Sequence, residues 1–538
     1  MDNFHSQDRE YDAIIVGAGF SGLYQLICLR DQLGLNCVIL ETGDDVGGTW
    51  YWNRYPGARC DTESHAYSYY FSDELLKEWT WSERYPGHAE IRRYMNFVAN
   101  KFDLKKDILF QQKVTSACFN NDENNWNVIT NNKNAFKAKF LISAVGCLSN
   151  TNIPNIKGLE DFEGKYYHTG NWPKNGVSFA GKNVGQIGTG STGIQAVPVI
   201  AEEAKHLTVF QRTANYSIPA RNKPLTSEFK KHVKENSDLY KNLVKRTPNA
   251  HPFEISKRNV ADVNPDELNE IYEKAWEIGG LQFRAVFNDL VTNIKANKTA
   301  SDFIKKKIRE TVSNKKFASI LSDIDHPYAG KRPPIDSNYF ETFNRDNVNL
   351  VDLRSEPIEL IDRTGIKTQK NHFDLDIIVF ATGYDAMTGP LINMNITGKN
   401  GLKLNEVWKE GPKTFLGLQI PGFPNLFTIT GPGSPSVLTN MPMAIEQHVE
   451  WIRDCINYMN KKDYSTIETD INSAEKWGDE VNSVANKTLL PTVKHSWYLG
   501  ANIPGKPRVF MPYAGGLPRY TEVCDKIKNN KYKDFILN

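Results

Sequence analysis

The chain has 538 residues, enough for two to four domains that each bury a core. Its 65 basic and 63 acidic residues leave a net charge of +2, which offers no attraction for nucleic acid or an anionic membrane. Hydrophobic residues make up 40% of the chain, and no apolar run reaches the roughly eighteen residues of a membrane span. We therefore expect no membrane insertion, no nucleic-acid partner, and small molecules as ligands.

The amino terminus and the cysteines bear on the cellular compartment. Residues 1–11 are polar and lack the apolar core of a signal peptide, so we expect a cytoplasmic location. The seven cysteines are scattered, odd in number and never spaced Cys-x-x-Cys. We expect free thiols in a reducing compartment, with no disulfide framework and no metal site.

A first glycine-rich loop lies between an apolar strand at 13–16 and a helix-compatible stretch at 23–32. It reads Gly17-Ala18-Gly19-Phe20-Ser21-Gly22, and such glycines let the backbone approach a pyrophosphate. A second apolar strand, 37–40, ends on Glu41, where a carboxylate can accept hydrogen bonds from a ribose 2′-hydroxyl. This half is predicted to bind an unphosphorylated ribose, as in FAD or NAD.

A second glycine-rich loop lies between a strand at 183–187 and a helix at 194–204. It reads Gly188-Thr189-Gly190-Ser191-Thr192-Gly193. The following strand, 207–211, ends on Arg212 and then Thr213, and a guanidinium there pairs with a 2′-phosphate that a carboxylate would repel. The loop therefore favours NADPH. A single loop of this kind is often a tight turn that binds nothing, but two in strand–loop–helix context make that reading weak.

The rest of the chain alternates in character. Residues 47–70 form an aromatic, glycine-rich stretch typical of an ordered loop, and 113–144 contain β-prone segments with Asn-rich turns, which predict a small antiparallel meander. Residues 223–323 have helical spacing, with helices expected at 266–278 and 301–312. Buried strands are expected at 348–352 and 376–380, and the Gly-, Pro- and aromatic-rich stretch at 496–516 suits a loop that covers a site.

Five residues between the two loops carry a resemblance to a known family. They are Phe162, Gly164, His168, Trp172 and Pro173. Their spacing resembles the fingerprint of type I Baeyer–Villiger monooxygenases, flavoproteins that use FAD, NADPH and O2 to insert one oxygen atom beside a ketone carbonyl. Other segments are similar to the family as well: 47–61, 331–333, 339–347, 381–384 and 496–506. The similarity runs from the first glycine loop to the last forty residues, with the helical insertion least distinctive.

The resemblance implies an α/β fold with two Rossmann-like dinucleotide-binding domains, a small β-meander and a helical insertion. An FAD-binding domain would comprise 1–147 and 382–538, with a control loop near 496–510. An NADP-binding domain would comprise 148–222 and 329–381, and the helical insertion 223–328. We expect a monomer, because the sequence shows no coiled coil and no apolar stripe that requires a partner.

The resemblance also implies roles for particular residues. Arg332 would be the fixed cation that stabilises a C4a-peroxyflavin and then the oxyanion of the ketone adduct, and Asp61 would orient it. Lys331 would join Arg212 at the 2′-phosphate. Without the resemblance, an arginine after a lysine reads as a surface pair or a nucleotide clamp, and the lysine as solvated.

Further positions match residues near the flavin, the nicotinamide or the substrate. On the flavin side these are Thr49, Trp50, Trp52, Tyr67 and Val114. Trp497 would reach NADP and substrate when the control loop closes and excludes water. The substrate pocket would include Ser436, Val437, Leu438 and Met441. His168 is interpreted as a structural or hinge residue, with direct proton transfer as the alternative, and Trp172 as a fingerprint residue or simply a packed linker aromatic.

The predicted reaction is conversion of a ketone to an ester or lactone, with sulfoxidation as a side activity. A flavin-dependent N- or S-oxygenase shares both glycine loops, but Trp172-Pro173 and Arg332 argue against it. A disulfide reductase of this architecture needs a redox cysteine pair, which the sequence lacks. A non-catalytic, NADPH-sensing flavoprotein is a third reading, although a sensor needs no oxyanion stabiliser.

Overall fold

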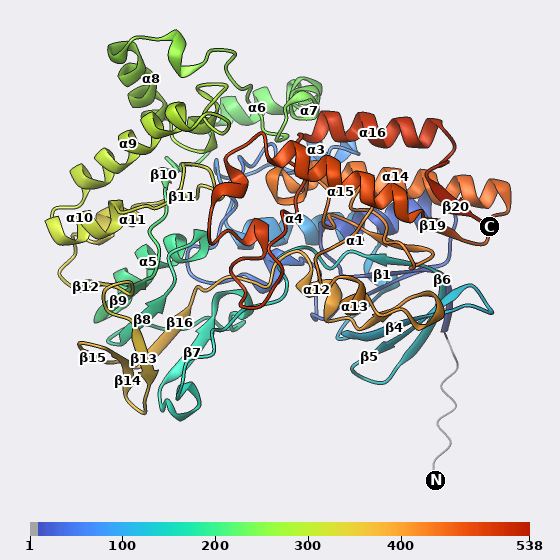
Figure 1. Cartoon of the computed structure of the whole chain (residues 1–538), viewed down its shortest axis with the longest axis horizontal. Coiled ribbons are helices and arrows are strands. Elements are labelled where there is room, and N and C mark those ends of the chain that lie inside the picture. Colours follow the sequence, from blue (N-terminus) through green and yellow to red (C-terminus); the bar gives the residue numbers. More distant parts are fainter. Residues whose placement is uncertain (1–8) are drawn as a thin grey trace.

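The computed structural model describes residues 9–538. Residues 1–8, most of the amino-terminal segment considered for a signal peptide, lie outside the described residues. Figure 1 shows two sheets at opposite ends of the molecule, with α8 (Pro265–Ile278) and α9 (Ile294–Thr311) above one and α14 (Met441–Lys462) above the other. None of the helices in residues 9–538 is long and apolar enough to cross a membrane. The mixed α/β architecture agrees with the predicted fold class.

The larger sheet has eight strands. They are β1 (Arg9–Val16), β2 (Cys37–Leu40), β3 (Ile108–Leu109), β4 (Val114–Asn120), β5 (Asn125–Thr130), β6 (Ala135–Ser143), β17 (Ile396–Thr397) and β18 (Leu426–Thr428). The order is β17-β4-β5-β6-β1-β2-β3, and β18 pairs with β6. β1 pairs in parallel with β2 and β6, while β4, β5 and β6 pair antiparallel. The predicted meander is therefore present, as an extension of this sheet.

The smaller sheet has five parallel strands in the order β12-β9-β8-β16-β7. They are β7 (Lys165–His168), β8 (Asn183–Ile187), β9 (His206–Gln211), β12 (Val348–Asp352) and β16 (Ile377–Phe380). The strands are mostly apolar because both faces of a parallel sheet are covered. A separate antiparallel sheet contains β13 (Ile358–Ile361), β14 (Gly365–Thr368) and β15 (His372–Asp374).

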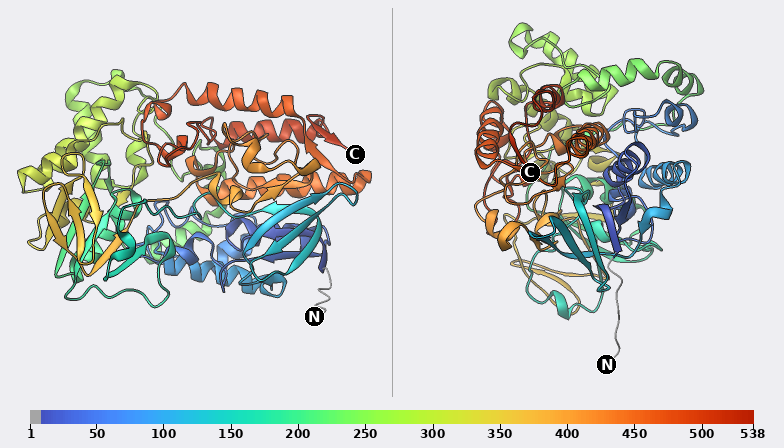
Figure 2. Two further views of the ribbon diagram at one scale, coloured as in Figure 1. Left: turned by 60° about the horizontal axis from the view of Figure 1, so that its bottom comes forward. Right: turned by 90° about the vertical axis from the view of Figure 1, so that its right-hand side faces the viewer.

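Helices fill the segment between the two halves of the smaller sheet. They are α6 (Ser227–Glu235), α7 (Ser237–Arg246), α8, α9 and α10 (Lys315–Ser322). α9 starts seven residues before the predicted Ser301, because the side chain of Asn293 accepts hydrogen bonds from the amides of Lys295 and Ala296 and so caps the helix there. Where the chain enters and leaves this segment, β10 (Ile218–Pro219) pairs with β11 (Ile335–Asp336). Both views in Figure 2 place these helices on one side of the smaller sheet.

The carboxyl-terminal part returns to the larger sheet. Helices α14, α15 (Ile471–Ala485) and α16 (Leu517–Asn529) follow β18, and α14 packs against both α16 and α1 (Phe20–Leu26). A π-helical segment, Ile27–Gln32, continues α1, so together they cover the helix predicted after the first glycine loop. Segments more than 400 residues apart in sequence thus share one core.

Candidate active site

The first glycine loop brings backbone close to backbone at the carboxyl end of β1. A Cβ on Gly22 would lie 1.9 Å from the carbonyl oxygen of Gly17, so only glycine fits there. Glu41 accepts hydrogen bonds from the amides of Ala18 and Gly43, each at 2.6 Å. Burial raises the pKa of Glu41, although these two hydrogen bonds act to lower it. The predicted ribose acceptor therefore lies directly beside the loop, and each of its oxygens retains a lone pair.

The second loop repeats this geometry at the end of β8. A Cβ on Gly188 would lie 2.4 Å from the Ala381 carbonyl oxygen, and a Cβ on Gly193 would lie 2.3 Å from the Gly188 carbonyl oxygen. A Cβ on Gly190 would have no atom within 4 Å. α5 (Ser191–Glu203) begins immediately after Gly190. The amino end of a helix therefore faces open space beside this loop, which suits a phosphate.

Two cations converge near the second loop. Arg212 is exposed at the end of β9, and the hydroxyl of Thr189 donates to the carbonyl oxygen of the adjacent Thr213 at 3.0 Å. Burial lowers the pKa of Lys331, and the charge of Arg212 lowers it further against the opposing effect of Asp325. Arg212 and Lys331 thus feel one another's charge, as residues sharing a phosphate would.

Aromatic side chains gather against the first loop. α2 (Thr49–Trp52) carries Thr49, Trp50 and Trp52, and the Trp50 indole donates to the Tyr67 hydroxyl at 3.1 Å. The rings of Phe20 and Tyr67 meet edge to face at 5.4 Å. Val114, by contrast, begins β4 and is buried in a different apolar cluster.

A bidentate ion pair joins residues 271 positions apart. Arg332 donates to Asp61 from Nε at 2.5 Å and from Nη2 at 2.7 Å, and from Nη1 to the Val437 carbonyl oxygen at 2.9 Å. Burial opposes ionisation of Asp61, but the guanidinium outweighs it and holds its pKa below the usual range. Burial alone would lower the pKa of Arg332, but the charge of Asp61 and its hydrogen bonds outweigh burial and raise the pKa of Arg332. The guanidinium is permanently charged and fixed in orientation.

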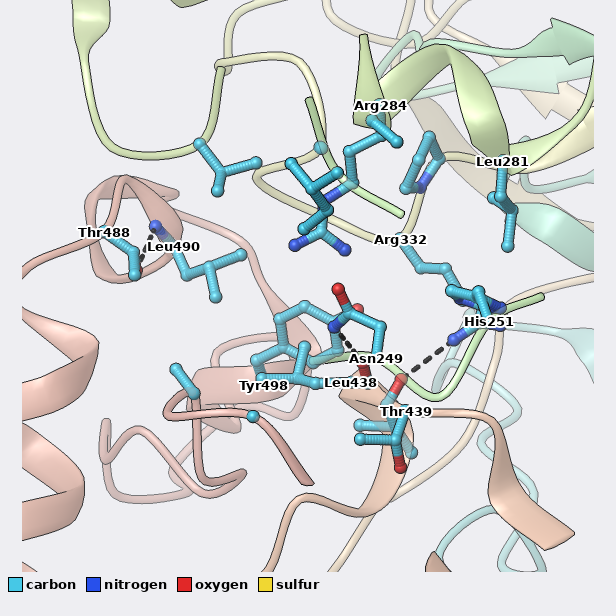
Figure 3. A pocket seen from close by; sticks show the side chains of 18 of the residues that line it. Asn249, His251, Leu281, Arg284, Arg332, Leu438, Thr439, Thr488, Leu490 and Tyr498 are labelled. Carbon is cyan, nitrogen blue, oxygen red and sulfur yellow. Dashed lines mark hydrogen bonds between the residues drawn. The ribbon is translucent and has the colours of Figure 1, made fainter. Parts of the chain in front are cut away.

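This guanidinium lies in the wall of a cavity of about 910 Å³, a volume that includes open solvent (Figure 3). Of the predicted pocket residues, Val437 and Leu438 line the cavity. Ser436 is buried with its hydroxyl facing Met387, and Met441 begins α14 and packs on the core, so neither is part of the lining.

Several lining residues have no counterpart in the sequence analysis. They are Asn249, His251, Leu281, Arg284, Leu490 and Tyr498. Burial and the nearby Arg332 lower the pKa of His251 to about 3, so it is neutral at neutral pH. Four of them precede the second half of the smaller sheet, in the helical insertion. Of these residues, only Tyr498 could have been inferred from the sequence, because it directly follows Trp497 in the predicted control loop. The two rings lie 4.5 Å apart.

The fingerprint residues lie on and around β7, the edge strand of the smaller sheet. A Cβ on Gly164 would clash with the ring of Phe162, and Trp172 is buried against Phe179. His168 accepts from the amide of Gly170 at Nδ1, and its Nε2 is buried without a partner. Burial lowers its pKa to about 4, so the ring is neutral.

The predicted control loop is docked on the exit of β16. Asn502 donates to the Tyr384 carbonyl oxygen at 2.8 Å, and Lys506 pairs with Asp385 at 2.5 Å and donates to the Ala386 carbonyl oxygen at 2.9 Å. In this arrangement Tyr498 faces the cavity.

Comparison with known proteins decides the family. Residues 11–223 match a family model described as flavin-binding monooxygenase-like. The chain is 44% identical to cyclohexanone 1,2-monooxygenase of an Acinetobacter species, over 98% of this chain and 97% of the relative. It is 41% identical to a Baeyer–Villiger monooxygenase of Pseudooceanicola batsensis, over 99% and 98%. The chain belongs to the Baeyer–Villiger monooxygenase family.

A solved structure of a family member points the same way. OTEMO in complex with FAD and NADP superposes with a TM-score of 0.95 at 38% identity, covering 99% of this chain and 100% of that one. Membership confirms the resemblance, the fold class and the flavoprotein ketone monooxygenase reading drawn from the sequence. The non-catalytic sensor gains no support from these relatives, and one further relative, 38% identical over 98% of this chain, is a phenazine N-monooxygenase of Lysobacter antibioticus. The cofactors of that complex, FAD and NADP, are the two predicted from the glycine loops together with the family resemblance.

Proposed function

We propose that this chain converts a ketone to an ester or lactone, with FAD as prosthetic group, NADPH as reductant and O2 as the source of the inserted oxygen atom. The observation that carries the proposal is Arg332, held by Asp61 and the Val437 carbonyl in the wall of the cavity. Bound, NADPH-reduced FAD supplies the oxygen-activating chemistry. Arg332 neutralises negative charge that develops on the reacting oxygen atoms.

The residues around the first loop fit an FAD. Gly17 and Gly22 keep the turn tight, Gly19 would let a pyrophosphate approach the backbone, and Glu41, which lies beside the loop, would accept from the ribose. The aromatic cluster beside the loop, formed by Phe20, Trp50 and Tyr67 with the neighbouring Thr49 and Trp52, then bounds the flavin. Val114 is proposed as a more distant flavin-side residue.

The residues around the second loop fit NADPH. The open space at Gly190 receives the pyrophosphate, with Ser191 and Thr192 at the start of α5. Arg212, Thr213 and Lys331 hold the 2′-phosphate, a role supported by the mutual repulsion of the two cations. His168 helps to couple the two domains through Tyr384, because its neutral ring packs against Tyr384 beyond β16 and the Tyr384 hydroxyl donates to Asn53 on the side of the first loop.

The two sheets suggest how the chain divides. We assign 1–147 and 382–538 to an FAD-binding domain, 148–222 and 329–381 to an NADP-binding domain, and 223–328 to a helical insertion. The strand pairings support this division, because each sheet combines strands from two separate segments. Trp497 and the rest of the control loop, 496–510, would close over the cavity.

The cellular setting and assembly are also proposed. Six of the seven cysteines are buried free thiols, which supports a reducing compartment such as the cytoplasm. The exposed large apolar side chains of residues 9–538 are scattered along the chain, which supports a monomer. Light scattering on the purified holoenzyme tests the latter.

Product analysis tests the activity. FAD-loaded enzyme receives NADPH, O2 and a panel of cyclohexanone, an aryl ketone, a long-chain ketone and an aryl sulfide. We expect esters or lactones, with the sulfoxide as a minor product, and Arg332→Ala should retain FAD and NADPH binding but form no ester. Sulfoxide alone, hydrogen peroxide alone, or a normal lactone yield from Arg332→Ala would overturn the proposal.

A further inference from the structure

A second arginine reaches into the same cavity. Arg284 lines it together with Arg332, and Figure 3 shows its side chain extending from the helical insertion toward the ring of Tyr498. Arg332 is close enough for its charge to lower the pKa of Arg284, after the larger effect of burial. A guanidinium nevertheless stays protonated at neutral pH.

The backbone under Arg284 is fixed. Arg284 lies in the short helix η6 (Leu281–Ala285), which follows Gly280 with φ of +78°. A Cβ on Gly280 would lie 2.0 Å from the Tyr85 hydroxyl oxygen, so the turn needs glycine. Gly280 donates to the Pro219 carbonyl oxygen at 2.9 Å, and the Ala285 carbonyl oxygen accepts from Ser256 at 2.8 Å.

The neighbouring side chains lock the same element. Leu281, Phe283 and Ala285 are buried, and the Phe283 ring stacks on Tyr272 at 5.4 Å and on Phe303 at 5.9 Å. Arg284 therefore cannot rotate away with its helix. Its direction into the cavity is built into the packing of the helical insertion.

Arg284 has no counter-charge in the described part of the chain. Its guanidinium makes no ion pair and no hydrogen bond there, whereas Arg332 has the carboxylate of Asp61. The cavity lining contains no aspartate or glutamate. Its other ionisable groups are neutral at neutral pH: the pKa of His251 is about 3, and burial raises those of Tyr498 and Tyr513 to about 12. The cavity thus carries one uncompensated positive charge.

An uncompensated, partly buried cation is costly unless a ligand pairs with it. We infer that the physiological ketone carries an anionic group, in the simplest case a carboxylate, that pairs with Arg284 while its carbonyl lies at Arg332. The inference rests on the proposed function and names its substrate class. Leu281, Val291 and Leu490 offer apolar wall for the carbon skeleton between the two charged ends.

A matched pair of ketones tests this pairing. The FAD-loaded enzyme with saturating NADPH receives 4-oxocyclohexane-1-carboxylate or its neutral analogue 4-oxocyclohexane-1-carboxamide, and lactone formation gives kcat/KM for each. We expect the wild type to prefer the carboxylate by about 10- to 100-fold, the range for a hydrogen bond to a charged partner. Arg284→Met should bring this ratio close to one, and Arg284→Lys should retain part of it.

The control is another arginine of the helical insertion. Arg246→Met makes the same change of side chain, but Arg246 is exposed, pairs with Glu254 and does not line the cavity. It should keep the wild-type ratio. FAD content of each variant reports folding, and inhibition by unreactive cyclohexanecarboxylate gives a readout independent of turnover. Its inhibition constant should rise in Arg284→Met by the same factor.

The outcomes separate the two levels of argument. A wild-type ratio near one, or a ratio unchanged by Arg284→Met, overturns the anionic substrate while leaving the ketone oxidation intact. A rise in KM for NADPH without a change in ratio assigns Arg284 to a cofactor phosphate and overturns it equally. If neither ketone yields a lactone and cyclohexanecarboxylate does not bind, the proposed function and this inference both fail.

Discussion

Replacing Asp61 by asparagine removes the charge that holds Arg332 while preserving the shape of the side chain. Arg332 makes two of its three hydrogen bonds to Asp61, and an asparagine offers one oxygen in place of two. At least one charge-assisted bond is lost, worth about 1.5–3 kcal/mol. The two side chains are 24% and 21% exposed, so solvent screens part of this loss. About 2 kcal/mol remains, which corresponds to roughly 30-fold in rate.

The assay compares ester formation with NADPH consumption. Asp61→Asn should form ester roughly 30-fold more slowly, a factor set by the loss of about 2 kcal/mol. NADPH oxidation should fall less, so a larger share of the reducing equivalents appears as hydrogen peroxide. FAD content should match the wild type, since the substitution leaves the first glycine loop untouched.

A double-mutant cycle separates positioning from a direct role. If Asp61 acts only through Arg332, then Asp61→Asn in an Arg332→Ala background should change NADPH oxidation by less than about twofold. NADPH oxidation is the readout because it stays measurable when no ester forms. Undiminished ester formation in Asp61→Asn, or effects of the two substitutions that simply multiply, would refute this reasoning.

Three further changes probe the cofactor site, the core and the control loop. Arg212→Ala should raise KM for NADPH about 10-fold or more and KM for NADH by less than about twofold, because only NADPH carries the 2′-phosphate; equal effects would remove its phosphate-binding role. Burial raises the pKa of Glu446 from 4.5 to about 8, so the unfolded chain releases this proton first and stability falls between pH 4.5 and 8, by up to about 5 kcal/mol. Glu446→Gln keeps the oxygen that accepts two backbone amides, and thermal unfolding from pH 5 to 8 should show a shallower loss of stability than the wild type; an unchanged slope contradicts this. Lys506→Met removes the pair with Asp385, and the hydrogen peroxide share of NADPH turnover should rise several-fold, whereas an unchanged share means that this contact does not govern closure.

The glycine loops were predictable from sequence because their constraint is local. Gly17 and Gly22 are only five residues apart, and the approach of their backbones excludes any side chain. The pairing of Asp61 with Arg332 spans 271 residues and followed only from the family resemblance. Nothing in the spacing of either residue indicates the other.

The helical insertion shows what periodicity leaves out. Helical spacing predicted α8 and α9. It does not predict that, after the turn that follows α8, Arg284 lines the cavity. α14 escaped prediction because it packs against both α1 and α16, so its apolar residues do not form one stripe. Where several neighbouring elements bury the sides of a helix, its apolar residues do not show a single helical period in the sequence.

The position of β16 has a consequence for synthesis of the chain. β7 and β8 follow one another within about twenty residues, yet they are not hydrogen-bonded neighbours, because β16 lies between them. During translation both strands therefore present unpaired edges until Phe380 has left the ribosome. At about 5–20 residues per second this interval lasts on the order of 10–40 seconds. A nascent chain of this protein carries two open sheet edges for that time, and each is a template for pairing with strands of other chains.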